Sequence, residues 1–240
     1  MSEAGGLYVT LMDFRILPAG DAAVLAELGD TLDLATVRKT WQGYAAIAAA
    51  VGGAGSVLDV VPAYGSVLVR FDPAHVRMGV IAAVVRGALE TAAEIREPPS
   101  RRFRIGVCFA PQYGLDIGAA AVETGMTESQ LIDEFCRPVY RVAFLGFTAG
   151  FPYLVGLSQR LWLSRLPNPR PRVPAGSVGV AAGQCGIYPR SLPGGWRIVG
   201  QTAAEVFNAA WPEPAALRPG DSVSFYAAGE LPDAVMETAG

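Results

Sequence analysis

The chain has 240 residues, of which 51% are hydrophobic and 17% charged, and its formal net charge is -3. This length allows one large domain or two small ones, and the apolar content is sufficient for a buried core. The slightly acidic balance argues against nucleic acid as a partner, because a phosphate backbone requires a basic surface. No segment approaches the roughly 18 consecutive apolar residues of a membrane span, and no secretion signal opens the chain, so we expect a cytoplasmic protein.

The residues that carry most catalytic chemistry are scarce. The chain has one histidine, His75, one lysine, Lys39, and three widely spaced cysteines at positions 108, 136 and 185. This inventory predicts no disulfide framework, no metal site and no phosphate-binding Walker loop, and a catalytic triad would depend on His75. Any chemistry must therefore depend on carboxylates, hydroxyls, arginines and backbone amides, or on a second protein.

The first part of the chain alternates pairs of short β-type runs with helical segments. Asp30 or Thr31 is placed to cap the first helix, and Gly52-Gly53 ends it. In the second helix, apolar residues recur at i, i+3, i+4 and i+7 from Ile81 to Ala88. The order ββαββα predicts a ferredoxin-like α+β domain over residues 1–97. Its expected elements are strands at 13–18, 22–28, 57–61 and 67–71, a helix ending at 52, and a helix opening at Asp72-Pro73.

A polar segment with two prolines, residues 97–102, marks the predicted domain boundary. Beyond it we expect a strand at 103–109 and helices at 116–123 and 127–135, the last opened by a capping box of Thr127 and Gln130. From Tyr140 onward, short β-type runs are interrupted by Gly and Pro every few residues. This spacing predicts that the second domain, residues 103–240, is a closed or nearly closed β-barrel.

Three aromatic residues, Phe147, Phe151 and Tyr153, lie at a predicted tight turn with Gly146 and Gly150. Glycines allow a close approach of the backbone to a ligand, and clustered aromatics provide an apolar wall with one hydroxyl group. The segment therefore fits a substrate-binding wall. It fits equally well a barrel corner whose aromatic rings fill the core.

A proline-rich loop at residues 167–174 carries two arginines, Arg170 and Arg172. Alternating prolines stiffen the loop, so the two guanidinium groups have little entropy left to lose on binding. They would suit a carboxylate or phosphate, and we interpret them as a candidate anion clamp. The alternative is that both are solvated surface arginines.

The segment from Ala181 to Trp196 is rich in glycine and aromatic residues. Gln184 and Tyr188 would form a polar pocket over the Trp196 indole, and we include all three among the candidate substrate-binding residues. Cys185 has no histidine nearby to activate it, which favours a buried small hydrophobe over a nucleophile.

Four segments of this region follow one another in a fixed order: LGFTAGFPYL at 145–154, PAGSVG at 174–179, GQCGIYP at 183–189 and PGGW at 193–196. They resemble the signature of the allophanate hydrolase subunit 1 family, also called the 5-oxoprolinase B-subunit family and KipI-like. The resemblance implies an N-terminal α+β domain followed by a cyclophilin-like β-barrel. It also implies a companion, the subunit 2 or C-type protein, and ATP-dependent opening of 5-oxoproline to glutamate.

The chain departs from the family pattern at Ala149, where proline is usual, at Phe135, where histidine is common, and at Cys185, where threonine is usual. Two hypotheses follow from the resemblance. In the first, the chain forms one wall of an amide-hydrolysing site with a C-type companion, and ATP binds this chain or that companion. In the second, it is a KipI-like inhibitor that binds a sensor histidine kinase without turnover. Prolyl isomerisation is a weaker third hypothesis, because a fold does not carry a function.

Overall fold

The computed structural model describes residues 13–92 and 100–239 of the chain. The chain divides into two compact units, Met1–Pro98 and Pro99–Gly240, called here the N-terminal and C-terminal units. Within the described ranges, no helix is both long enough and apolar enough to cross a membrane. The mixture of helices and sheets in both units confirms the mixed α/β character expected from the sequence.

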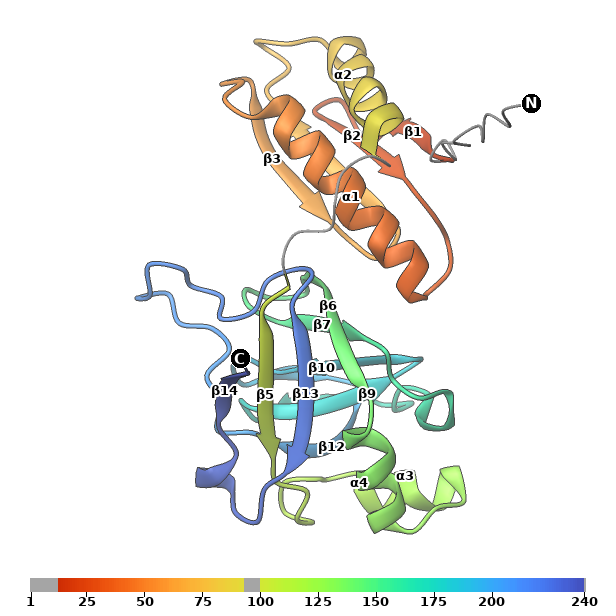
Figure 1. Ribbon diagram of the computed structural model, residues 1–240, viewed down its shortest axis with the longest axis vertical. Coiled ribbons are helices and arrows are strands. Elements are labelled where there is room, and N and C mark those ends of the chain that lie inside the picture. The colour runs from red at the N-terminus through yellow and green to blue at the C-terminus, as the bar shows by residue number, and fades with distance from the viewer. Residues whose placement is uncertain (1–12, 93–99, 240) are drawn as a thin grey trace, which may run out of the picture. The chain divides into compact units, whose positions relative to one another are not determined.

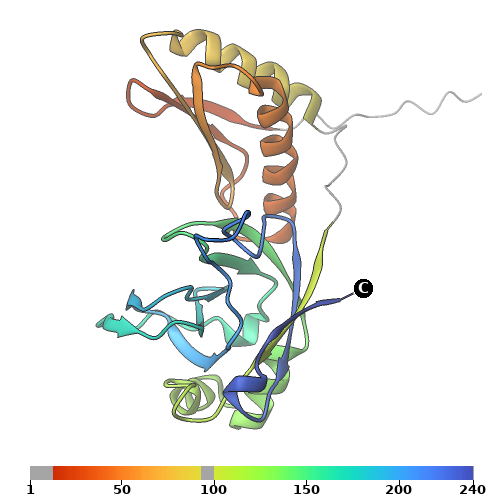
Figure 2. The ribbon, with the colours of Figure 1, turned by 90° about the vertical axis from the view of Figure 1, so that its left-hand side faces the viewer.

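The N-terminal unit is a four-stranded antiparallel sheet with the strand order β1-β2-β4-β3 and two helices packed on one face (Figures 1 and 2). Strands β2 and β4 alternate buried and more exposed residues, so Val24, Val67 and Val69 point into the core beneath the helices. The chain order ββαββα differs from the βαββαβ order of ferredoxin-like domains. The elements are β1 (Arg15–Pro18), β2 (Ala23–Glu27), α1 (Leu34–Val51), β3 (Val57–Pro62), β4 (Ser66–Phe71) and α2 (Met78–Thr91).

Both helices of this unit begin later than the sequence indicated. Helix α1 is capped by Asp33, which accepts a 2.7 Å hydrogen bond from the Thr36 N–H, and not by Asp30 or Thr31. Helix α2 does not open at Asp72-Pro73, because Asp72 closes a separate turn by accepting from the Ala74 N–H. Extended backbone at Arg77 follows, so regular helix begins only at Met78.

The C-terminal unit contains an eight-stranded sheet in the order β12-β9-β10-β7-β6-β13-β5-β14 and a two-stranded sheet of β8 and β11. Helix α4 begins with the predicted capping box of Thr127 and Gln130, which is confirmed. The elements are β5 (Arg102–Val107), α3 (Ile117–Thr124), α4 (Glu128–Cys136), β6 (Val139–Leu145), β7 (Pro152–Val155), η2 (Gln159–Leu161), β8 (Arg170–Val173), β9 (Ser177–Ala181), β10 (Gln184–Ile187), β11 (Leu192–Gly194), β12 (Arg197–Gln201), β13 (Ser222–Ala227), η3 (Leu231–Asp233) and β14 (Met236–Ala239).

The large sheet is not a closed barrel, in contrast to the stricter form of the prediction. Its edge strands β12 and β14 do not pair with each other among the described residues. A single bridge between Cys108, just after β5, and Gln201 joins the two sides of the sheet. Figure 1 shows β5 and β13 in front of β9, β10 and β12, and one apolar core lies between these strands. Gly200 permits the close approach, because a Cβ there would lie 2.5 Å from the Val107 side chain.

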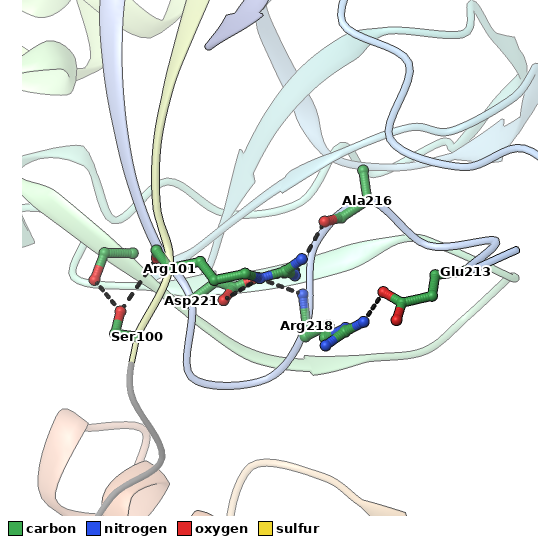
Figure 3. Close-up of polar contacts among 7 residues, drawn as sticks. Ser100, Arg101, Glu213, Ala216, Arg218 and Asp221 are labelled. Carbon is green, nitrogen blue, oxygen red and sulfur yellow. Dashed lines mark hydrogen bonds and ion pairs between the residues drawn. The ribbon is translucent and has the colours of Figure 1, made fainter. Parts of the chain in front are cut away.

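A buried carboxylate anchors the start of the C-terminal unit (Figure 3). Asp221 receives hydrogen bonds from the Arg101 guanidinium at 3.1 and 2.5 Å and from the Arg218 N–H at 2.8 Å. Beside it, the hydroxyls of Ser100 and Ser222 lie 2.7 Å apart. These contacts fix the beginning of β5 against the beginning of β13, the one parallel strand pair of the described sheets.

We predict that Asp221→Ala lowers the free energy of unfolding by about 2–3 kcal/mol, because Arg101 and the Arg218 N–H lose a buried acceptor. The matched control is Glu213→Ala, which removes an exposed ion pair to Arg218 and should cost less than about 1 kcal/mol. Urea unfolding followed by circular dichroism measures both. Equal effects of the two substitutions would contradict this role of Asp221.

Candidate functional site

Three of the predicted aromatic residues form a packed cluster. The Phe151 ring meets Tyr188 at 5.2 Å and Trp196 at 5.5 Å, both edge to face, and all three side chains are buried. Burial raises the pKa of the Tyr188 hydroxyl, against an opposing effect of a hydrogen bond from the backbone N–H of Trp196. These rings fill a second, smaller core of the C-terminal unit, and their neighbour Tyr153 is half-buried at its edge.

The glycines of the signature segments make room for these rings. A Cβ at Gly186 would lie 2.7 Å from the Phe151 ring, and one at Gly194 would lie 2.3 Å from the Tyr188 hydroxyl oxygen. Contacts this short do not occur between real side chains, so larger residues would displace the aromatics. The glycine-rich pattern therefore serves packing at these positions.

Tyr153 lies at the edge of the cluster. Its ring stacks on Phe144 with centroids 4.5 Å apart, and burial raises the pKa of its hydroxyl, against an opposing effect of Arg165. The hydroxyl is consequently protonated at neutral pH and can donate a hydrogen bond. Gln184, on the neighbouring strand β10, is half-buried.

Arg170 does not stand free on its loop. Its guanidinium binds Asp116 through two hydrogen bonds of 2.9 and 2.7 Å, and the same carboxylate accepts the Ile198 N–H at 2.7 Å. Asp116 is 7% exposed and Arg170 27%. The bidentate pair connects the start of α3 to β8 and β12, so both terminal nitrogens of Arg170 are already engaged.

Arg172 is exposed and lies among other polar residues, of which the sequence had indicated none as a candidate. Its Nε donates to the Ser191 hydroxyl at 2.9 Å, and the adjacent Arg190 donates to the Thr148 hydroxyl at 2.9 Å. We call Thr148, Arg172, Arg190 and Ser191 the polar strip. Arg190 was missed as a candidate, although it directly follows the GQCGIYP segment, because no pattern showed that its loop returns to the Phe147 turn.

Phe147, the remaining predicted aromatic, projects from the turn between β6 and β7. Its side chain is 63% exposed, and its backbone has a positive φ of 64°. The ring touches Phe151 edge to face at 5.6 Å. The turn and the polar strip thus form one continuous surface through Thr148.

Two further positions singled out by the sequence belong to the core. Phe135 is fully buried and packs against Tyr140 and Phe225, so an aromatic ring fills this position. Cys185 is also fully buried, and burial raises its thiol pKa far above the ordinary range. The one histidine, His75, lies in the N-terminal unit on the surface beside Asp72.

No group of three or more His, Cys, Asp or Glu side chains suited to a metal occurs among residues 13–92 and 100–239. The comparisons with known proteins identify the family. The model of the carboxyltransferase domain, subdomains C and D, matches residues 14–217. The 5-oxoprolinase B subunit of Escherichia coli O157:H7 is 36% identical over 207 residues, which cover 86% of this chain and 92% of that protein. The chain belongs to the 5-oxoprolinase B-subunit family.

Other members and structures agree with this placement. The 5-oxoprolinase B subunit of Bacillus subtilis is 37% identical over 70% of this chain and 74% of its own length. The crystal structure of TTHA0988 is 34% identical with a TM-score of 0.73, over 86% of this chain. This chain spans only 39% of the length of TTHA0988. The Kluyveromyces lactis urea carboxylase, 20% identical over 90% of this chain and 22% of its own, shares the fold with a TM-score of 0.68.

We predict that Asp116→Asn destabilises the C-terminal unit by about 2–4 kcal/mol, because it leaves the Arg170 guanidinium partly buried without a counter-charge. Glu213→Gln is the matched control, since Glu213 is 63% exposed and its partner Arg218 49% exposed, so loss of this ion pair should change stability by less than about 1 kcal/mol. Thermal unfolding of both variants is the measurement. A wild-type melting curve for Asp116→Asn would disprove the structural role of this pair.

A second prediction concerns thiol reactivity. The thiolate is the reactive form, and burial raises the pKa of Cys136 to about 11 and that of Cys185 still higher. Iodoacetamide should therefore leave Cys185 unmodified in the folded chain between pH 7 and pH 9 and modify it after unfolding in urea. Mass spectrometry of the peptides reports both. Stoichiometric alkylation of Cys185 in the folded chain within minutes would restore it as a candidate nucleophile.

Proposed function

We propose that the chain is one component of a heteromeric, ATP-dependent 5-oxoprolinase, which opens the amide bond of 5-oxoproline to give glutamate. The observation that carries the proposal is the set of relatives named as the B subunit of 5-oxoprolinase, 31–37% identical and matched over 74–98% of their own lengths. Their naming as one subunit supports the presence of a companion, and we take this companion to be the subunit 2 or C-type protein.

The surface formed by Tyr153, Gln184 and the polar strip is our proposed substrate wall. 5-Oxoproline carries a carboxylate, and Arg172 and Arg190 are exposed guanidinium groups that would bind it. The Tyr153 hydroxyl and the Gln184 amide would bond to the substrate's polar groups. Arg170 acts through its pair with Asp116 and positions β8, the strand that carries Arg172.

The buried aromatics support this wall from behind. Phe151, Tyr188 and Trp196 pack beneath Tyr153 and the turn, and their contact with substrate is indirect in this proposal. A wall held by a rigid aromatic core keeps its geometry when ligand binds, which reduces the entropy lost on binding.

We place most of the ATP contacts on the companion. Arg172 and Arg190 would reach a phosphate, but the described helices do not begin at a glycine-rich loop that would wrap it: their N-cap residues are Asp33, Arg77, Asp116 and Thr127. A metal that accompanies ATP would likewise draw its ligands from the companion or from the nucleotide. ATP would supply the phosphoryl group that activates the stable amide.

We also retain the finer fold assignment as a proposal. If the last strand of a ferredoxin-like domain were placed at the start of its chain and the strands were renumbered, its sheet would have the order β1-β2-β4-β3. This is the strand order of the N-terminal unit. The eight-stranded sheet with its single bridge would correspond to a cyclophilin-like barrel opened between β12 and β14.

The proposal predicts that glutamate forms only when the chain, its C-type companion and any further component of the complex are present with ATP and 5-oxoproline. The isolated chain should be inactive, because the described site offers a protonated tyrosine and arginines but no general base near neutral pH. Substantial turnover by the chain alone would refute the shared site. A chain that binds no companion and instead inhibits a sensor histidine kinase would favour the second hypothesis.

In the assembled complex, Arg172→Ala and Arg190→Ala should each lower kcat/KM by about ten- to a hundred-fold, because each removes a charge-assisted contact to an anionic ligand. Arg102→Ala, at an exposed position on β5, is the matched control and should leave the rate within about two-fold. Size exclusion confirms assembly for each variant. If both variants keep wild-type kinetics, Arg172 and Arg190 are solvated surface arginines and do not bind the substrate.

A further inference from the structure

Phe147 combines two unfavourable features in one residue. Its φ of 64° lies in the left-handed region, where a bulky side chain is disfavoured, and its ring is 63% exposed to water. The turn is also tight, because the Thr148 N–H donates to the Gly146 carbonyl only two residues back, at 2.6 Å. Strain of this kind persists only where the surrounding structure imposes it.

The surroundings hold the turn in this shape. The Phe151 N–H donates to the Thr148 carbonyl at 3.1 Å, and Arg190, in the loop between β10 and β11, donates to the Thr148 hydroxyl. On the other side, Gly150 lies directly against Phe207, where a Cβ would come within 2.3 Å of that side chain. The backbone that carries the Phe147 ring is therefore held in one shape, so little backbone entropy remains to be lost when the ring is buried.

An exposed, preorganised aromatic beside an arginine has the composition of a binding hot spot in a protein interface. A partner protein is favoured over a small ligand because the fold recurs inside longer chains, of which it makes up 39% in TTHA0988 and 22% in the urea carboxylase. In such chains the same unit has further protein to pack against. The charge beside the ring is positive, through Arg190, which favours an acidic rim on the partner.

We propose that Phe147 is the anchor by which this chain docks onto its C-type companion. The ring enters an apolar pocket of the companion, and the rim of that pocket carries acidic side chains that complement the positive charge of the turn. This inference rests on the proposed function, since it assigns the contact between the two proteins to the turn beside the substrate wall.

The test uses Phe147→Gly and Phe147→Ala in the full chain, titrated with the companion by isothermal titration calorimetry. Glycine adopts a positive φ without strain, so Phe147→Gly should melt at or above the wild-type temperature while its affinity for the companion falls at least about 30-fold. Phe147→Ala should lose affinity to the same extent. Val122→Ala, which truncates an 83% exposed apolar residue on α3, is the matched control and should bind normally.

Four other results would contradict the anchor role of Phe147, the identity of its partner or the proposed function. Wild-type affinity with an increased KM for 5-oxoproline would make Phe147 a substrate contact and sink the anchor. A wild-type homodimer that Phe147→Gly dissociates would replace the companion with a second copy of the chain. If the wild-type chain itself fails to bind the companion, the proposed function falls, and the anchor falls with it. If the wild-type chain and the Phe147 variants bind equally well, the proposed function stands and the anchor is wrong.

Discussion

The carboxylate of Asp116 holds together segments that the chain order keeps far apart. It precedes α3, binds Arg170 on β8 by two hydrogen bonds, and accepts the Ile198 N–H of β12. Because three N–H groups converge on one nearly buried carboxylate, the two-stranded sheet of β8 and β11 is tied to the large sheet at a defined position. The placement of Arg172, two residues from Arg170, follows from this contact.

The signature segments acquire a physical explanation in this arrangement. Gly186 and Gly194 lie against the rings of Phe151 and Tyr188, so glycines and aromatics from different segments of the chain fit one another. The core they form is closely packed and buried, and the surface beside it is provided by other residues. That surface consists of half-buried and exposed residues at the edge of the core: Tyr153, the Phe147 turn and the polar strip.

The LGFTAGFPYL segment contains both core residues and surface residues. Phe151 and Phe147 are four residues apart, but the first is 1% exposed and the second 63%. Substitution of the first removes packing and should lower stability, whereas substitution of the second removes an exposed ring and, with glycine, also relieves backbone strain. A loss of activity in either variant therefore has a different physical origin, and stability measurements distinguish the two.

Local features of this protein were determined by the sequence alone. The capping box of Thr127 and Gln130 involves residues three apart and was predicted correctly, and short-range patterns indicated the order of strands and helices as far as Phe135, although both N-terminal helices begin later than expected. The order of the four signature segments was sufficient to indicate the family, and the carboxyltransferase-domain match and the relatives confirmed it.

Only the tertiary structure decided which candidate side chains are free to act. Arg170 and Arg172 look equivalent in the sequence, but Asp116, 54 residues before Arg170, engages the first and leaves the second exposed. Whether an aromatic residue fills a core or faces solvent likewise depends on glycines elsewhere in the chain. The closure of a sheet into a barrel depends on whether its two edge strands pair with each other. These outcomes are set by contacts between residues far apart in the chain, which local propensity and spacing do not encode.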